Sequence, residues 1–251
     1  MLIQPLLDRL TAMQLNGLRA GLALQLQSAQ YAELSFEERL GLLIDQEWTA
    51  RQAAQFQRRL KAARLHQGAT IEDLDMAPSR GLDRARILGL AQADWIRERQ
   101  GVIVVGPTGA GKTFVACALG HAACRHGFTV RYERLGRLLY SITLAHADGS
   151  YPKLLDALRR VELLILDDWL RDPLTTAQAR DVLELLDDRY GHRATLVATQ
   201  VPEGDWHPRL GDPTLADAIL DRVVHNAHRL HLKGESQRKA RSTLTMVIAS
   251  C

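Results

Sequence analysis

The sequence predicts an α/β protein in which a small all-helical N-terminal domain precedes a P-loop type parallel sheet with flanking helices. Three observations support this prediction. Within the first 70 residues, apolar side chains recur at three- and four-residue steps, which is helical spacing. From Gly101 on, short apolar runs alternate with helical stretches, which is typical of βαβ units. A glycine-rich loop directly follows the first of these runs.

The N-terminal segment is expected to form an amphipathic helical bundle, because its leucines repeat with helical periodicity at Leu6, Leu10 and Met13 and then at Leu18, Leu22 and Leu26. Ser35 with Glu38 three residues later forms a capping box, in which two side chains satisfy backbone N–H groups at a helix start. The helix that begins there is predicted to run to about Leu65. We expect the helical domain to span residues 1–70.

The remaining chain divides into three predicted segments. Residues 71–100 are a linker and helices leading into the core, because Gly68, Pro78 and Gly81 interrupt the helical pattern. Residues 101–241 form the core domain and 242–251 a tail. Within the core the predicted strands are VIVV at 102–105, TVRY at 129–132, LLIL at 163–166 and TLVA at 195–198.

Composition excludes several classes of protein. In 251 residues, 46% are hydrophobic and 24% charged, as in ordinary globular chains, so the sequence is neither disordered nor membrane-embedded. No apolar run reaches the roughly 18 residues of a membrane span, and no secretion signal begins the chain. The three cysteines form no CxxC pair, which favours a reduced compartment. We expect a cytoplasmic protein with no membrane partner.

Basic residues are concentrated in two places, although the net charge is only +3. The segment from Trp48 to Ile71 contains no acid and carries the candidate DNA-binding residues Arg51, Arg58, Arg59, Lys61 and Arg64. The second segment runs from Arg222 to Arg241, with Glu235 as its only acid. Such segments bind nucleic-acid phosphates with little regard for sequence. The alternative is a solvated helical face, which would bind nothing.

The glycine-rich loop has the spacing of a phosphate-binding P-loop and lies between a predicted strand and a predicted helix. Its glycines let the backbone wrap phosphate oxygens, and the helix N-terminus presents unpaired N–H groups. Lys112 would neutralise the β and γ phosphates of ATP, and Thr113 would place its hydroxyl on Mg²⁺. The predicted nucleotide-binding residues are Gly106, Pro107, Thr108, Gly109, Ala110, Gly111, Lys112 and Thr113.

Two acids follow the buried strand LLIL, at the strand end where open α/β sheets bind ligands. Asp167 would hold the magnesium through its water shell, and Asp168 would orient and deprotonate the attacking water. The alternative is a strand-ending turn, where Asp is also common. Thr199 and Gln200 follow the strand TLVA, and either is a candidate contact for the γ-phosphate or the water.

The order of these features resembles the IstB-like helper ATPases of insertion-sequence transposition. The resemblance covers nearly the whole chain. Its specific marks are SFEERLGLLIDQEWTAR at 35–51, LKAARL at 60–65, GLDRA at 81–85, GPTGAGKT at 106–113, LILDDW at 164–169 and GDPTLADAILDR at 211–222. That family is similar to the bacterial helicase loader DnaC and the initiator DnaA within the AAA+ ATPases, so the resemblance implies an AAA+ core and a bacterial cytoplasmic protein.

The resemblance further implies a homo-oligomer whose subunits share nucleotide sites. Arg222 is the candidate arginine that enters the neighbouring subunit's site and stabilises charge on the γ-phosphate. Arg238 is a candidate phosphate sensor within its own subunit. The implied function is an ATPase, stimulated by double-stranded DNA, that assembles on target DNA and assists a partner transposase. One departure is Leu170, at a position where the resemblance leads us to expect a glycine after Trp169.

Four other classes of protein use the same P-loop. A DnaC-like replicative helicase loader shares the core, but the N-terminal segment and the sequence after Arg222 match the transposition helper better. A small-molecule kinase needs an arginine-bearing lid, and no such segment stands out. A non-catalytic ATP-gated scaffold needs no water-activating acid, so Asp168 argues against it. A GTPase is excluded because no Asn-Lys-x-Asp stretch is present.

Overall fold

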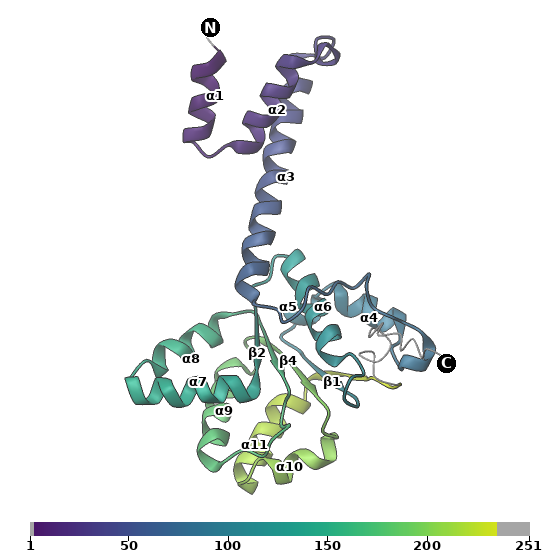
Figure 1. Cartoon of the computed structure of the whole chain (residues 1–251), viewed down its shortest axis with the longest axis vertical. Helices are drawn as coiled ribbons and strands as arrows, with labels where there is room; N and C mark the ends of the chain where they lie inside the picture. Colours follow the sequence, from purple (N-terminus) through teal and green to yellow (C-terminus); the bar gives the residue numbers. More distant parts are fainter. Residues whose placement is uncertain (1–2, 235–251) are drawn as a thin grey trace, which may run out of the picture. The chain divides into compact units, whose positions relative to one another are not determined.

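The computed structural model describes residues 3–234, and the chain divides into two compact units. One unit extends to Arg58 and the other begins at Arg59, so the division falls inside a single helix, α3 (Phe36–Ala63). The first unit also contains α1 (Ile3–Ala12), α2 (Asn16–Gln27) and a short 3₁₀ helix, η1 (Ala29–Tyr31). The predicted helical N-terminal region is confirmed (Figure 1).

The start of α3 is fixed by the expected capping box. The Ser35 N–H donates to Glu38 Oε2 at 2.8 Å, and the Glu38 N–H donates to Ser35 Oγ at 3.2 Å. Each side chain therefore satisfies a backbone donor of the other residue, as the sequence predicted. The helix ends at Ala63, two residues before the predicted end.

Helices α2 and α3 cross closely because two glycines lie at the crossing. A Cβ on Gly17 would lie 2.7 Å from the backbone of Gln46 and Glu47, and one on Gly21 would lie 2.8 Å from Leu43 Cδ2. Glu47 Oε2 also accepts the Leu18 N–H at 3.0 Å, which satisfies a donor in the first turn of α2. Backbone contact rather than a large apolar core joins these helices.

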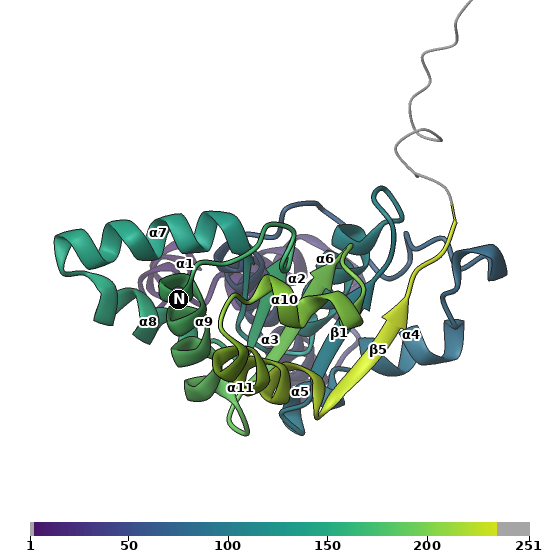
Figure 2. The same ribbon diagram turned by 90° about the horizontal axis from the view of Figure 1, so that it is seen from below.

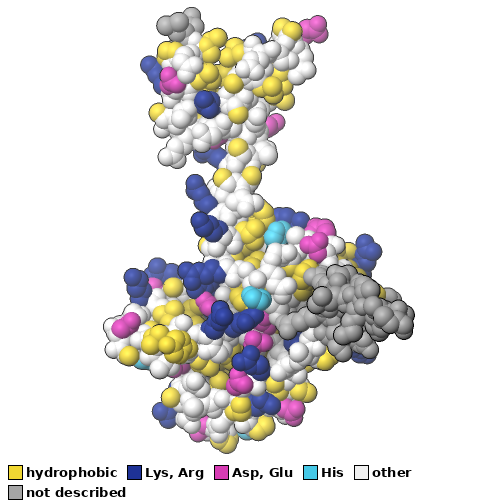
Figure 3. Space-filling model, in the orientation of Figure 1, with side chains coloured by type: hydrophobic (Ala, Val, Ile, Leu, Met, Phe, Trp, Pro, Cys, Tyr) yellow, Lys and Arg dark blue, Asp and Glu magenta, His cyan; other side chains and the backbone are white. Residues whose placement is uncertain are grey.

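Many apolar side chains of this first unit face solvent, contrary to the expected bundle core. Among its described hydrophobic residues only Leu10 and Leu43 are buried. Figure 3 shows the resulting spread of apolar side chains over these helices. Three helices in so short a segment enclose too little volume to cover every leucine. The exposed ones include Ile3, Met13, Leu24, Leu26, Phe36, Leu42, Ile44 and Trp48.

The second unit is built on a five-stranded parallel sheet with the order β2-β3-β4-β1-β5. Its strands are β1 (Gly101–Val105), β2 (Val130–Arg134), β3 (Leu163–Asp167), β4 (Ala194–Thr199) and β5 (Ala227–His231). The four predicted strands are confirmed. The sequence missed β5, because AHRLH is an edge strand that buries only Leu230 and so lacks a continuous apolar run.

Helices cover both faces of the sheet (Figure 2). One face packs against α6 (Lys112–Arg125), where a Cβ on Gly120 would lie only 2.8 Å from Ile165 Cδ1. The other face contributes Ile103, Leu164 and Val197 to a core shared with helices that follow β2, β3 and β4. These helices are α7 (Leu135–Asp148), α8 (Tyr151–Arg160), α9 (Thr176–Arg189), α10 (Trp206–Arg209) and α11 (Pro213–Val224), with η3 (Glu203–Asp205) before α10.

Between α3 and β1 lie η2 (Pro78–Arg80), α4 (Arg84–Ala91) and α5 (Asp94–Arg97), in the segment expected to be a linker with helices. Asp83 caps α4 by accepting the Ala85 N–H at 2.9 Å. Among residues 3–234, no helix combines the length and apolar character needed to cross a membrane.

Candidate functional site

The P-loop connects the end of β1 to the start of α6, as predicted. Gly111 precedes α6 and has a backbone φ of +94°, a conformation that residues with a Cβ rarely adopt. Residue 106 must be glycine for a different reason, because a Cβ there would lie 2.8 Å from the Leu232 carbonyl oxygen beside β5. Lys112 Nζ donates to the Pro107 carbonyl at 2.9 Å, so the ammonium lies within the loop.

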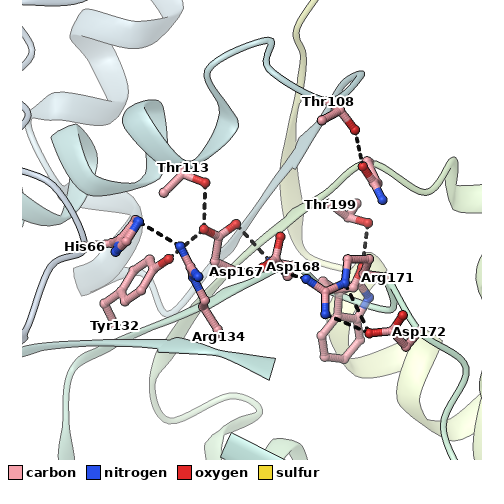
Figure 4. Close-up of polar contacts among 12 residues, drawn as sticks. His66, Thr108, Thr113, Tyr132, Arg134, Asp167, Asp168, Arg171, Asp172 and Thr199 are labelled. Carbon is pink, nitrogen blue, oxygen red and sulfur yellow. Dashed lines mark hydrogen bonds and ion pairs between the residues drawn. The ribbon is translucent and has the colours of Figure 1, made fainter. Parts of the chain in front are cut away.

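The two acids lie at the carboxyl end of β3, next to the start of α6. Asp167 is 2% exposed, and its Oδ2 accepts hydrogen bonds from Thr113 Oγ1 and from the Tyr132 hydroxyl, each at 2.7 Å (Figure 4). Its Oδ1 accepts the Asp168 N–H at 2.9 Å. The Asp167 carboxylate is therefore fixed from three directions.

A hydroxyl and a carboxylate in contact form a donor set that fits Mg²⁺, which takes few protein ligands and keeps water and phosphate oxygens as the rest. Thr113 and Asp167 would hold the ion. Among the described residues no group of three or more His, Cys, Asp or Glu side chains is placed to bind a metal. The hydroxyl of Thr113 and the carboxylate of Asp167 are thus the two side-chain groups here that fit an ion of this kind.

Asp168 adopts φ of +55°, in the left-handed region that Asp tolerates better than most residues. Its side chain is 37% exposed and lines the same pocket as the P-loop. Two arginines flank its Oδ2, with Arg171 Nη1 at 3.5 Å and Arg134 Nε at 4.0 Å. A partly exposed carboxylate beside the phosphate loop can reach a water molecule there.

Thr199 and Gln200, the two candidate polar contacts at the end of β4, lie in different environments. Thr199 is fully buried, and its hydroxyl donates to the Trp169 carbonyl at 2.6 Å and accepts the Val201 N–H at 3.0 Å. Gln200 is exposed, lines the P-loop pocket and accepts a hydrogen bond from Thr108 Oγ1. The geometry therefore favours Gln200 as the phosphate-side contact and gives Thr199 the task of fixing the backbone after Asp168.

The expected linker contributes to the site, which the sequence analysis missed. Arg80, only 9% exposed at its side chain, donates from Nη2 to the P-loop carbonyl of Ala110 at 2.6 Å. The GLDRA stretch beginning at Gly81 was the available signal, since it was among the motifs of the family resemblance. The segment contributes Asp73, Leu74, Asp75, Arg80 and Leu82 to the P-loop pocket, and Gln67, which precedes it, lines the same pocket.

Tyr132 and Arg134 were also missed as site residues, although TVRY was predicted as a strand. Burial and the hydrogen bond to Asp167 raise the pKa of Tyr132, so its hydroxyl remains a donor at neutral pH. The hydrogen bond with Tyr132 raises the pKa of Arg134, and the charges of Asp168 and Asp167 raise it further. Arg134 pairs in register with Asp167, so the strand order brings it to the acids.

Arg222 lies at the amino ends of the strands, whereas the P-loop lies at their carboxyl ends. It lines a pocket with Gly101 and Asn226, which lie at the amino ends of β1 and β5. Strand β1 has five residues, so roughly 15 Å of sheet separates this edge from the P-loop. Arg222 Nε donates to Asp187 at 2.7 Å. It cannot reach the P-loop of the same chain.

The remaining predicted residues fall in different environments. Arg58 and Arg64 are exposed, as is Lys61, whereas Arg59 donates from Nε to the Cys124 carbonyl at 3.0 Å. Arg51 forms an ion pair with Glu47 at 2.6 Å. Arg59 thus holds the end of α3 on α6, and the exposed residues are the freer candidates for phosphate contacts. Arg238 lies outside the described residues.

A P-loop opening a helix on this parallel sheet, with paired acids on a nearby strand, defines a P-loop protein of the AAA+ fold. Solved structures share that fold. The DnaC helicase loader aligns with a TM-score of 0.54 and 19% identity over 70% of this chain and 99% of the loader. AMPPCP-bound DnaA from Aquifex aeolicus aligns with a TM-score of 0.57 and 17% identity over 70% and 54%.

Within that class, the chain belongs to the family of IstB-like ATP binding proteins, which matches residues 8–245. A putative insertion sequence ATP-binding protein of Sinorhizobium fredii is 45% identical, over 95% of this chain and 98% of its own length. A putative ATP-binding protein of insertion sequence IS1162 from Pseudomonas fluorescens is 43% identical, over 85% and 95%. The family resemblance stated from the motifs is confirmed.

Proposed function

We propose that this protein is a magnesium-dependent ATPase that assembles on target DNA and assists a transposase during insertion-sequence transposition. The observation that supports the ATPase assignment most directly is the contact between Thr113 and Asp167, with Asp168 beside them at the P-loop pocket. That arrangement has both an ion-holding pair and a separate carboxylate for water. A scaffold that only binds nucleotide has no use for the second acid.

Each residue has a distinct task in the proposed reaction. Lys112 and the N-terminus of α6 bind the phosphates, and Thr113 and Asp167 hold the ion, which supplies charge neutralisation when bound. Asp168 accepts a proton from the attacking water, and its mobility is limited by Arg171 and Arg134. Gln200 orients the water or the γ-phosphate from the end of β4.

The DNA and transposase parts of the proposal rest on family membership and charge. Relatives along nearly the whole chain are insertion-sequence proteins. The exposed Arg58, Lys61 and Arg64 give the α3 region a cationic character suited to sequence-tolerant phosphate contacts. A DnaC-like helicase loader is the second candidate, because the loader shares the fold over 99% of its own length.

Phosphate release by the purified protein, with and without magnesium and duplex DNA, tests this proposal. We expect magnesium-dependent hydrolysis that DNA accelerates, and Lys112→Ala should abolish nucleotide binding. Capture of an insertion-sequence transposase by this protein should require ATP and DNA. Transfer of phosphate to a small acceptor would instead identify a kinase, and stimulation of replicative helicase loading would identify the second candidate.

The DNA contact is tested by its salt dependence. Replacing Arg58, Lys61 and Arg64 together by Ala should reduce the slope of log affinity against log salt by up to about 3 units, roughly 0.9 per phosphate contact. Arg159→Ala with Arg160→Ala is a matched control, because these arginines form ion pairs with Asp156. An unchanged slope in the triple variant would mean that the segment is a solvated face.

The assignment of Arg222 to a neighbouring subunit's site is tested by mixing two inactive proteins. Arg222→Ala retains an intact P-loop, and Lys112→Ala retains the arginine, so mixed oligomers contain some complete sites. We expect partial recovery of phosphate release that depends on the mixing ratio. If no ratio restores activity, the role of Arg222 across an interface is wrong.

A further inference from the structure

One histidine outside the P-loop and the acid pair contacts the side chains that support both acids. His66 follows α3 by three residues, and its Nε2 lies 2.7 Å from Arg134 Nη2 (Figure 4). The imidazole is also stacked on Tyr132, with ring centroids 6.0 Å apart and an interplanar angle of 13°. His66 therefore meets the two β2 residues that reach Asp167 and Asp168.

The contact with Arg134 has a defined direction. A guanidinium has donors only, so His66 Nε2 must accept the hydrogen bond with its lone pair. Arg134 Nε lies 4.0 Å from Asp168 Oδ2, and Tyr132 donates to Asp167 at 2.7 Å. Through one edge and one face of its ring, His66 thus limits the positions of both supporting side chains.

The chain around His66 is itself held in place on α6. Arg59 donates to the Cys124 carbonyl at 3.0 Å, near the C-terminus of α6. Leu65 packs at Gly120, where an added Cβ would lie 3.0 Å from Leu65 Cδ2. Helix α6 begins at Lys112, so the segment that carries His66 is anchored to the helix that carries the P-loop. A histidine on an anchored segment can fix a neighbouring side chain.

We propose that His66 is a positioning residue for hydrolysis, which acts through Arg134 to hold Asp168 at the P-loop pocket and through Tyr132 to hold Asp167. The inference rests on the proposed ATPase function and adds a residue that the P-loop and acid motifs do not contain. Loss of its acceptor should slow the chemical step and leave nucleotide affinity unchanged.

Two substitutions at His66 test the effect of its acceptor nitrogen separately from the effect of its ring. His66→Phe keeps a ring against Tyr132 but removes the acceptor for Arg134, whereas His66→Gln restores an acceptor without the ring. Since outer-shell partners affect activity by about 10- to 100-fold, we expect kcat to fall at least about tenfold in His66→Phe. KM for ATP should change by less than about threefold, and His66→Gln should recover most of the lost rate.

His192→Phe is the matched control, because His192 is an exposed histidine in the turn between α9 and β4. The double variant His66→Phe with Arg134→Ala should be no slower than Arg134→Ala alone, since both changes break the same contact. Thermal unfolding of each variant establishes that it is folded; if His66→Phe is not, His66→Ala, which also lacks the acceptor, replaces it in the single and double variants.

Three outcomes would overturn the inference. They are a His66→Phe kcat equal to that of His192→Phe, additive losses in the double variant, or a loss confined to KM. An unmodified protein that releases no phosphate would instead refute the proposed function, and the inference with it. An active unmodified protein with an equally active His66→Phe refutes only the role of His66.

Discussion

Asp168→Asn should abolish most of the ATP hydrolysis while leaving ATP binding intact. The substitution keeps side-chain size and removes the ability to accept a proton. It also suits the backbone, since Asn tolerates the left-handed conformation that residue 168 adopts at φ of +55°. The side chain is 37% exposed and flanked by Arg171 and Arg134, so an uncharged amide there is solvated and should not unfold the core.

The expected magnitude follows from the task assigned to the carboxylate. A positioned general base contributes about 10²- to 10⁴-fold to a rate. At about 1.4 kcal/mol per tenfold, that corresponds to roughly 3–5 kcal/mol of barrier height. Phosphate release at saturating ATP measures kcat, and titration with a fluorescent ATP analogue measures affinity. Affinity should remain within about threefold of the unmodified protein.

A neighbouring acid provides the control. Asp172 pairs with the same Arg171, at 2.9 Å, but its side chain is 73% exposed and it does not line the P-loop pocket. Asp172→Asn should leave kcat within about twofold of the unmodified rate. Equal rates in Asp168→Asn and Asp172→Asn, or a loss of ATP affinity that accounts for the whole effect, would refute the assignment of Asp168 as the base.

Three further predictions concern the scaffold. Arg189 is 1% exposed and donates hydrogen bonds to the carbonyls of Leu158, Val161 and Ala194. Arg189→Met should therefore lower the free energy of unfolding, measured by urea titration, by about 2–4 kcal/mol. Arg193 is exposed, so the control Arg193→Met should change it by under about 0.5 kcal/mol. Leu170 is fully buried at φ of +50°, so Leu170→Gly relieves about 1–2 kcal/mol of strain but loses more in packing; a more stable variant would contradict this. The hydrogen bonds from Arg51 and Leu18 lower the pKa of Glu47. Above pH 4.5 the Leu18 amide should therefore be less protected from hydrogen exchange in Glu47→Gln than in the unmodified protein. The difference between the two proteins should vanish as the pH falls through the lowered pKa of Glu47 in the folded protein.

Local signals predicted the elements that depend on neighbours in the sequence. Ser35 and Glu38 define the start of α3 because a capping box needs only a few consecutive residues. The buried strands were found because parallel strands covered on both faces are continuous apolar runs. The edge strand β5 was missed because an edge position tolerates polar residues such as His228 and Arg229.

The unusual residue after Trp169 shows the limit of a motif. The resemblance led us to expect glycine, and the structure gives that position φ of +50°, a value that glycine adopts freely. Leu170 occupies it instead and is fully buried in the core shared with α9 and α11. Packing therefore compensates backbone strain there, which no local pattern reports.

The sequence by itself determined the P-loop, the paired acids and the strands that hold them, because phosphate binding and strand burial demand particular residue types at fixed spacing. Only the tertiary structure decided which distant groups complete the site. Strand order placed Tyr132 and Arg134 of β2 beside the acids of β3. The path of the chain brought Arg80 to the P-loop and His66 to Arg134. These contacts join residues far apart in sequence, so their geometry follows from packing of the whole domain.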